Sequence, residues 1–391
     1  MKTTSWISRA RSLLRVFVAA SLLTAAVRGG PALVFSAVNI GDGHSTAALG
    51  TVAAPAHQLT EPEPENAISA VMDAFDRYPV VALGMSHRQQ DEADFSLALI
   101  RDPRFAPKVR NVVVEAGNSL YQDLLDRYVA GGDVPLEQLQ LVWRNITNPG
   151  SGDALNAANG KPLVKELFDT VREVNRRLPV VRRIRVLAGD PPIVWDKVHS
   201  PADVASFMTR RDTHFASVVE KEVLARHQKA LLVIGAGHVL KHPISWASQT
   251  QLPAPTVTML IESKYPHSTY VITPHDGFAD RTGELEPRLS NWPVPSLAPL
   301  RGTWLGSLDA GLPFRGKIRR VGSDPSKVEE PFPGLKLQEI ADAYLYLGPA
   351  AAIREVEFPR ETGTPYAREL ERRRMLLGGG PLPAAPSPTP R

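Results

Sequence analysis

Four ionisable residues stand close to glycines, each where a short apolar run ends. The runs cover 80–84, 111–114, 184–187 and 230–234, and the residues are His87, Glu115, Asp190 and His238. An imidazole gives and takes a proton near neutral pH, and a carboxylate beside it orients the ring and stabilises its cation. These residue types therefore predict proton-transfer chemistry, provided that the fold brings them together.

The apolar periodicity indicates the elements that position these residues. It predicts helices over 65–77, 91–101, 120–128, 163–174 and 215–223, and strands over the four runs, with later strands over 256–261, 270–273 and 343–347. Strands that alternate with helices of about ten residues or more favour a parallel sheet covered on both faces. We expect a three-layer α/β fold with a mostly parallel central sheet.

In such a sheet the C-terminal strand ends meet at one edge, which is where open α/β folds bind ligands. The glycines allow tight turns and a close approach of a ligand to the backbone. Taken singly, each residue has an ordinary structural alternative: Asp190 before Pro191 suits a helix N-cap, for example. The four together favour one shared crevice.

The amino-acid composition excludes several classes of reactive site and of binding partner. The 391 residues include no Cys, which excludes disulfides, thiol nucleophiles, Cys-type zinc sites and iron–sulfur clusters. Lys and Arg number 45 against 41 Asp and Glu, a net charge of +4 that does not indicate a nucleic-acid partner. We expect a small-molecule substrate or ligand instead.

The two ends of the chain lack the alternating strand and helix patterns of its middle. Residues 1–38 carry basic side chains and then an apolar run over 16–27, which is typical of a signal peptide or an N-terminal anchor. We expect export to the periplasm or the cell exterior, with membrane contact only through this segment. Residues 39–61 are predicted to be a flexible linker, 62–372 a single α/β domain, and 373–391 a disordered Pro-rich tail.

Three of these motifs resemble those of one superfamily. The run 80–87, the strand that ends in Glu115, and Gly235-Ala236-Gly237-His238 are similar to motifs of the erythromycin esterase and ChaN-like superfamily, which includes the TraB and Tiki proteins. The likeness covers roughly residues 65–245. It implies the same three-layer fold and, for the esterases, a histidine that activates water without a metal.

One position departs from the pattern. Members of the superfamily typically begin with L-G-E-x-H, whereas this chain has Met85 in place of the glutamate. A thioether can neither titrate nor orient an imidazole. Either activity is lost, or Glu92, Asp91 or Glu115 takes over the role of the missing carboxylate.

The first interpretation is a hydrolase that acts on an ester-like or amide-like small molecule. His87 would remove a proton from water, and Glu115 or Asp190 would hold its ring. His238 or Arg211 would stabilise the developing oxyanion, so that Arg211 contacts the substrate.

Trp195 has two interpretations that the sequence does not separate. It would either line the mouth of the crevice as a flat surface for substrate, or pack under the helix that follows.

Three other interpretations use the same crevice. His87 and His238 with a carboxylate would suffice for Zn²⁺ or Mn²⁺, and the Tiki branch of the superfamily is metal-dependent. A non-catalytic relative would bind a ligand, and haem, which is the less favoured cofactor, is suggested by the ChaN-like group. A serine hydrolase would use Ser86, Asp190 and His238, but Arg88 stands where a nucleophile elbow needs a small residue.

Overall fold

The computed structural model describes residues 59–87, 89–148, 162–244, 253–275, 285–312, 331–354, 356 and 363–378. Contacts divide the chain into two units, Met1–Ala56 and His57–Arg391, and all described residues belong to the second. The predicted signal segment, most of the predicted linker and the chain beyond residue 378 lie outside the described residues.

The strands form one mixed sheet in the order β1-β7-β8-β6-β2-β5-β3-β4. From β8 to β4 every neighbouring pair is parallel, whereas β7 and β1 join antiparallel at the other end. The predicted α/β fold with a mostly parallel sheet is confirmed. The strands are β1 Glu65–Asn66, β2 Val80–Met85, β3 Arg110–Asn118, β4 Arg185–Asp190, β5 Lys229–Gly235, β6 Thr269–Pro274, β7 Ser296–Pro299 and β8 Ala343–Tyr346.

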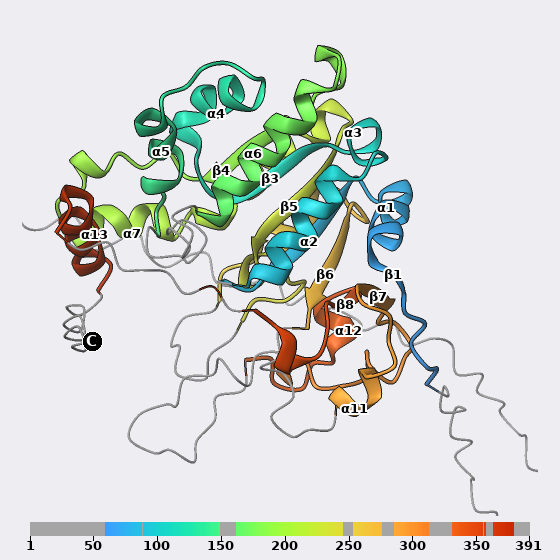
Figure 1. Cartoon of the computed structure of the whole chain (residues 1–391). Helices are drawn as coiled ribbons and strands as arrows, with labels where there is room; N and C mark the ends of the chain where they lie inside the picture. Colours follow the sequence, from blue (N-terminus) through green and yellow to red (C-terminus); the bar gives the residue numbers. More distant parts are fainter. Residues whose placement is uncertain are drawn as a thin grey trace, which may run out of the picture. The chain divides into compact units, whose positions relative to one another are not determined.

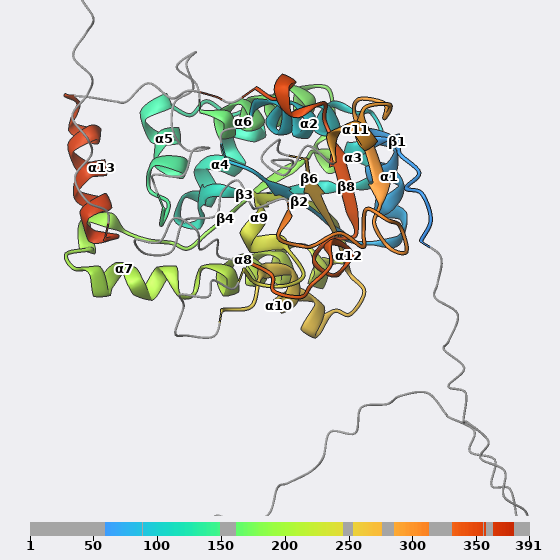
Figure 2. The ribbon, with the colours of Figure 1, turned by 90° about the horizontal axis from the view of Figure 1, so that it is seen from below.

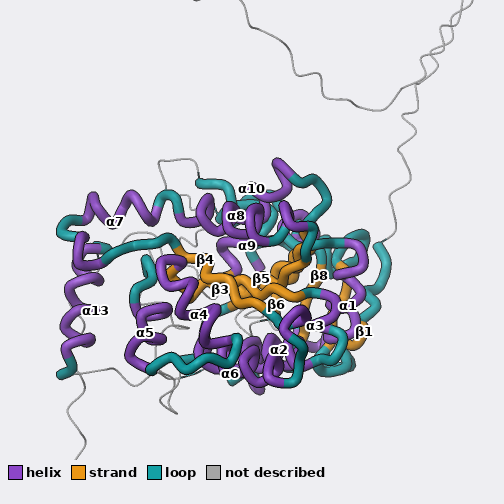
Figure 3. Tube along the Cα trace, turned by 90° about the horizontal axis from the view of Figure 1, so that it is seen from above, coloured by secondary structure: helices purple, strands orange, loops and turns teal. Residues whose placement is uncertain are grey.

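Helices cover both faces of this sheet (Figures 1 and 3). One apolar core packs α1 to α6 against the first face, and the other packs α8, α9, α10 and α12 against the second. The helices are α1 Ala67–Arg77, α2 Gln90–Arg101, α3 Phe105–Lys108, α4 Gln122–Val129, α5 Leu136–Arg144, α6 Leu163–Arg176, α7 Pro201–Met208, α8 Arg211–Glu222, α9 Ala236–Val239, α10 Val257–Lys264, α11 Glu286–Leu289, α12 Leu337–Ile340 and α13 Pro365–Leu376.

The central strands are buried on both faces, which explains why their sequences are continuous apolar runs. All six residues of β2 are buried. Their register is strict: Val114 of β3 pairs with Val233 of β5 and with Ala188 of β4, and Met85 pairs with Gly235. The strands that precede the predicted site residues therefore end at nearly the same level.

Residues 256–261, which we predicted as a strand, form a helix instead. The Thr256 side chain caps α10 by accepting a hydrogen bond from the Met259 N–H. Val257 and Ile261, four residues apart, are both buried against the sheet. A short apolar run fits a buried strand and a buried helix equally well, and here the cap and the i,i+4 spacing decide.

The last described helix lies at the β4 end of the sheet. Figure 2 shows α13 beside α7, and the Arg372 guanidinium of α13 donates hydrogen bonds to the carbonyl oxygens of Trp195 and Val198. α13 ends at Leu376, so the first residues of the segment predicted as a tail are helical. None of the helices in the described part of the chain is long and apolar enough to span a membrane.

Candidate functional site

The strand order places the four predicted residues at one edge of the sheet. β2, β5, β3 and β4 are consecutive neighbours, and His87, His238, Glu115 and Asp190 lie at or just beyond their C-terminal ends. The structure thus brings together the residues that the sequence singled out. Their roles in chemistry remain predictions.

Glu115 is the buried centre of this cluster, with 4% of its surface exposed. Its Oε1 atom accepts a hydrogen bond from Arg211 at 2.7 Å, and its Oε2 atom accepts one from the Gly235 N–H at 2.7 Å. Burial alone raises the pKa of Glu115. The charges of Arg211, His238 and His87, together with the Gly235 N–H, outweigh burial and lower this pKa to about 2. Glu115 is therefore ionised at neutral pH.

Arg211 links Glu115 to Asp190. It is the first residue of α8, and its Nε atom donates to Oδ1 of Asp190 at 2.9 Å while Nη2 donates to Glu115. Its third nitrogen, Nη1, lies 3.1 Å from Nε2 of His238. Only 4% of Arg211 is exposed. The structure thus places Arg211 inside the cluster, where it holds side chains of the protein, instead of at a surface that a substrate reaches.

Asp190 is fully buried at the end of β4. Besides Arg211, it is held by Thr147, whose N–H and hydroxyl donate hydrogen bonds of 2.6 and 2.7 Å to its two oxygen atoms. Burial raises the pKa of Asp190 against the lowering effects of Arg211 and Thr147. The residue does not cap a helix, which was its structural alternative. Sequence reasoning missed Thr147 as a site residue because nothing in its local sequence indicates a contact with Asp190.

His238 is oriented by a residue that sequence reasoning also missed. Its Nδ1 atom lies 2.5 Å from Oδ1 of Asp212, the second residue of α8. Because Arg211 can only donate, the Nε2 atom of His238 accepts from it, and Nδ1 carries the proton toward Asp212. The ring also lies 4.0 Å from Oε1 of Glu115. The only signal for Asp212 was its position next to Arg211.

His87 lies on the exposed side of the same cluster. A Cβ atom on Gly235 would stand 2.8 Å from Oε2 of Glu115 and 3.4 Å from Nε2 of His87. Both atoms thus lie against Gly235, and only glycine leaves them room. His87 also contributes to the lowered pKa of Glu115, which confirms that the imidazole is within electrostatic reach.

The three carboxylates that were candidates to replace the missing glutamate have different surroundings. Glu115 is in the cluster. Glu92 is buried, and its Oε2 atom accepts a 2.5 Å hydrogen bond from the Ser86 N–H, so it holds the backbone next to His87. Asp91 instead pairs with Arg354. Glu115 and Glu92 therefore flank the His87 segment, whereas Asp91 binds a distant part of the chain.

Of the two interpretations of Trp195, the structure supports the one in which it is packed inside the protein. It is 3% exposed and packs in a small apolar core with residues around α7. Its Nε1–H donates to the carbonyl oxygen of Ile146 at 3.1 Å, and the guanidinium of Arg373 lies 4.7 Å from the centre of its ring. Trp195 supports the segment that carries Thr147 and offers no open surface to a substrate.

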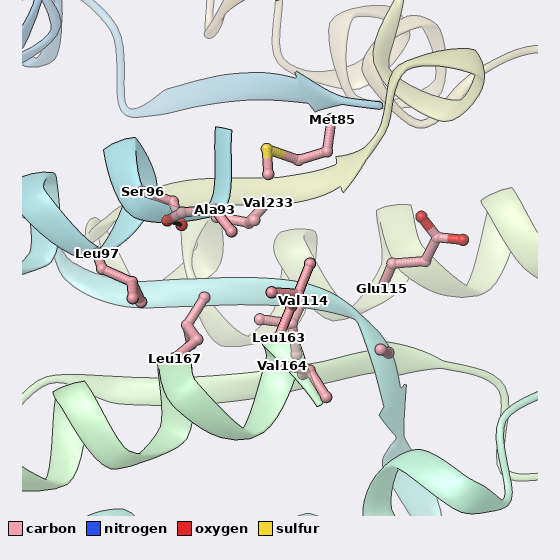
Figure 4. Close-up of a pocket in the computed structure, with 11 residues that line it drawn as sticks. Met85, Ala93, Ser96, Leu97, Val114, Glu115, Leu163, Val164, Leu167 and Val233 are labelled. Atoms are coloured by element: carbon pink, nitrogen blue, oxygen red, sulfur yellow. Dashed lines mark hydrogen bonds between the residues drawn. The ribbon is translucent and has the colours of Figure 1, made fainter. Parts of the chain in front are cut away.

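A small apolar cavity of about 40 Å³ lies on the other face of the sheet. Glu115 is among the residues that line it, but its carboxylate points away from the other lining side chains (Figure 4) and binds Arg211. Met85 lines the cavity, which shows that this side chain serves apolar packing. Its other apolar lining residues include Ala93, Leu97, Val114, Leu163, Val164, Leu167 and Val233.

The side chains of the cluster do not form a metal site. Among the described residues, no group of three or more His, Asp or Glu side chains is placed to hold a metal ion. Within the cluster, Arg211 occupies the position between the two carboxylates where a cation would lie. The residues around His87 and His238 therefore fit a guanidinium better than a metal.

No protein-family model and no curated protein matches the chain. Several solved structures do. A mutant of the erythromycin esterase EreC in its open conformation is 12% identical, with a TM-score of 0.47, over 74% of this chain and 94% of its own. A protein from Bacillus cereus is 9% identical, with a TM-score of 0.45, over 76% of this chain and 97% of its own. A succinoglycan biosynthesis protein is 10% identical, with a TM-score of 0.46, over 76% of this chain and 96% of its own. An erythromycin esterase is thus among the solved structures to which this chain is similar.

Proposed function

We propose that the chain is a hydrolase that activates water with a histidine and attacks an ester-like or amide-like small substrate at the C-terminal edge of the sheet. One observation carries the proposal: two imidazoles, one exposed at His87 and one oriented at His238, flank the ionised and buried carboxylate of Glu115. A fixed negative charge next to an imidazole favours the cation that forms when the ring takes a proton.

The reaction would run in two proton transfers. His87 removes a proton from water, and the water oxygen bonds to the substrate carbonyl carbon, whose π electrons move onto its oxygen. When the carbonyl forms again, the bond to the leaving alcohol or amine breaks, and the His87 imidazolium returns its proton to that group. The charge of Glu115 stabilises the imidazolium between the two transfers.

His238 is proposed to position Arg211, whose positive charge stabilises the developing oxyanion, because the Nδ1 proton of His238 is directed at Asp212 and its Nε2 atom accepts from Arg211. The His238 side chain is 26% exposed, whereas Arg211 and Glu115 are almost fully buried, so it is the part of the cluster that a substrate can reach besides His87. Asp212 fixes the ring, and Arg211 adds positive charge behind it. The preorganised pair would lower the barrier without any movement of the protein.

The experiment is a screen of carboxylic esters, lactones and amides with the wild-type chain, His238→Ala and His199→Ala. His199 is exposed in the loop before α7, and its backbone N–H donates a hydrogen bond to Asp203, away from the cluster around Glu115. The proposal predicts turnover of at least one ester by wild type and His199→Ala, and strong loss in His238→Ala. Turnover that is equal in all three would contradict it.

The second candidate is a protein that binds a small ligand without catalysis, haem included. It is favoured by Met85, which brings an apolar side chain to the strand position where the resembled motif has a glutamate. Native mass spectrometry of the purified chain would then detect a bound molecule, and haem would give a visible absorption band. Absence of turnover together with a bound ligand that His87→Ala loses would support this candidate.

Export is also a proposal. The basic and apolar character of residues 1–38 supports it, and these residues lie outside the described part of the chain. Fractionation of cells that express the full chain would test it, with the periplasm or the medium as the expected location.

A further inference from the structure

Two neighbouring valines are held out into solvent. Val180 and Val181 are 73% and 74% exposed, the highest values among the large hydrophobic residues of the described chain. They lie in the 3₁₀ turn Val180–Arg182, between α6 and β4. We call residues 177–184 the valine loop. Exposed apolar side chains that gather at one place commonly mark an interaction site.

The valine loop is fixed to the body of the protein. Arg110, at the start of β3, donates a 2.5 Å hydrogen bond from Nη2 to the carbonyl oxygen of Val181. Arg183 donates one of 2.8 Å from Nη1 to the carbonyl oxygen of Ala130. These contacts hold the backbone from both sides, so the valines cannot turn inward without breaking them. Their exposure is therefore built into the fold.

Positive charge surrounds the valines. Arg176, Arg177 and Arg182 are exposed on either side of them. Of these, Arg177 pairs with Glu173 at 2.8 Å, whereas Arg176 and Arg182 make no ion pair within the described residues. Glu222, the last residue of α8, is bound to two other arginines, Arg185 and Arg226. The valine loop thus combines an apolar tip with a basic rim.

Membrane contact was expected only through the N-terminal segment, and we propose that the valine loop also docks on an anionic membrane surface, with the two valines in the interface and the arginines against lipid phosphates. An apolar tip with a basic rim matches such a surface in both of its properties. A nucleic acid would match the charge but would give the valines no apolar environment. The loop precedes β4, so docking would leave the opposite edge of the sheet, with the candidate site, directed away from the lipid (Figure 1).

The test uses the full chain with one labelled cysteine. Because the sequence has no Cys, Val181→Cys gives a unique position for an environment-sensitive fluorophore. With vesicles of phosphatidylcholine and phosphatidylglycerol, we expect the emission to move to shorter wavelength and rise several-fold. Added Arg176→Gln and Arg182→Gln should weaken docking of the loop, measured from the emission at position 181, about 30-fold, at about 1 kcal/mol for each charge removed. High salt should weaken it as well.

Two controls make the result specific. Met375→Cys places the same label on α13, where the side chain is 51% exposed and lies outside the valine loop. Its emission should not change, even when the N-terminal segment holds the chain on vesicles. The proposal is overturned by an unchanged emission at position 181, by equal changes at both positions, or by the same change with phosphatidylcholine alone.

Discussion

The Nδ1 atom of His238 lies 2.5 Å from Oδ1 of Asp212, and this contact decides which nitrogen of the ring faces the candidate site. Since Asp212 accepts a hydrogen bond from Nδ1–H, the Nε2 lone pair is directed at Arg211, and Nε2 lies 4.0 Å from Oε1 of Glu115. A carboxylate that fixes the tautomer of a histidine is a positioning group in the sense of a catalytic triad.

Asp212→Asn should therefore reduce turnover with little effect on folding. Both side chains are partly exposed, so the free energy of unfolding should change by less than about 1 kcal/mol. Turnover of the ester found in the screen should fall about a hundredfold or more, because the ring loses its fixed orientation. Nitrogen NMR of the wild type should show the Nδ1 atom of His238 protonated. Unchanged turnover in the variant would remove Asp212 from the site.

The parts of this arrangement that were predictable share one property, which is that they lie at or just beyond the C-terminal ends of strands. Glu115, Asp190 and His238 follow apolar runs, and a parallel sheet brings the ends of such runs to one edge. Asp212 was missed because the helical pattern was recognised only from Phe215, whereas α8 begins at Arg211.

Other parts carried no local signal. Thr147 reaches Asp190 from a loop, through a contact that spans 43 positions in the sequence. No spacing in the sequence encodes that approach. The helix α10 was mistaken for a strand because Val257 to Ile261 is apolar without a clear period, and the cap at Thr256 is visible only as a hydrogen bond.

Arg211→Met should destabilise the protein strongly. The guanidinium lies between two buried carboxylates, and its loss leaves both without their counter-charge. Removal of one partner from a buried ion pair costs about 3–5 kcal/mol in the free energy of unfolding. Urea denaturation would measure this cost. Arg177→Gln is the matched control because its pair with Glu173 is exposed, and it should cost less than about 1 kcal/mol. Equal effects of the two substitutions would contradict a central role for Arg211.

Glu115 should make the free energy of unfolding depend on pH in the acidic range. Its pKa is about 2 in the folded protein against an ordinary value of 4.5, so the folded state favours the ionised form. The resulting contribution, on the order of 3 kcal/mol, is complete above pH 4.5 and is lost as pH falls toward 2.

The matched measurement is the unfolding free energy of wild type and Glu115→Gln across that pH range. The wild type should be more stable at neutral pH, and the difference should shrink between pH 4.5 and 2. Asp190 has the opposite effect because its pKa is raised: as the pH rises above its ordinary value of 3.8, it lowers the stability of both proteins. A difference that does not change with pH would show that Glu115 is not held ionised.

Ser86→Ala should leave turnover unchanged. Ser86 is 7% exposed, and its N–H is held by Glu92, so its contribution to the site is the backbone position beside His87. A serine nucleophile would instead lose activity by about a thousandfold or more on this substitution. Steady-state rates on the same ester, with a search for an acyl-enzyme by mass spectrometry, separate the two mechanisms.

The most direct measurement is the turnover of one ester by His87→Ala relative to His199→Ala. The account predicts that His199→Ala retains wild-type turnover, while His87→Ala loses about 10²–10⁴-fold, the usual contribution of a general base. Both variants should unfold at the wild-type urea concentration, since both histidines are exposed. Wild-type turnover in folded His87→Ala would contradict the claim that this imidazole activates the attacking water.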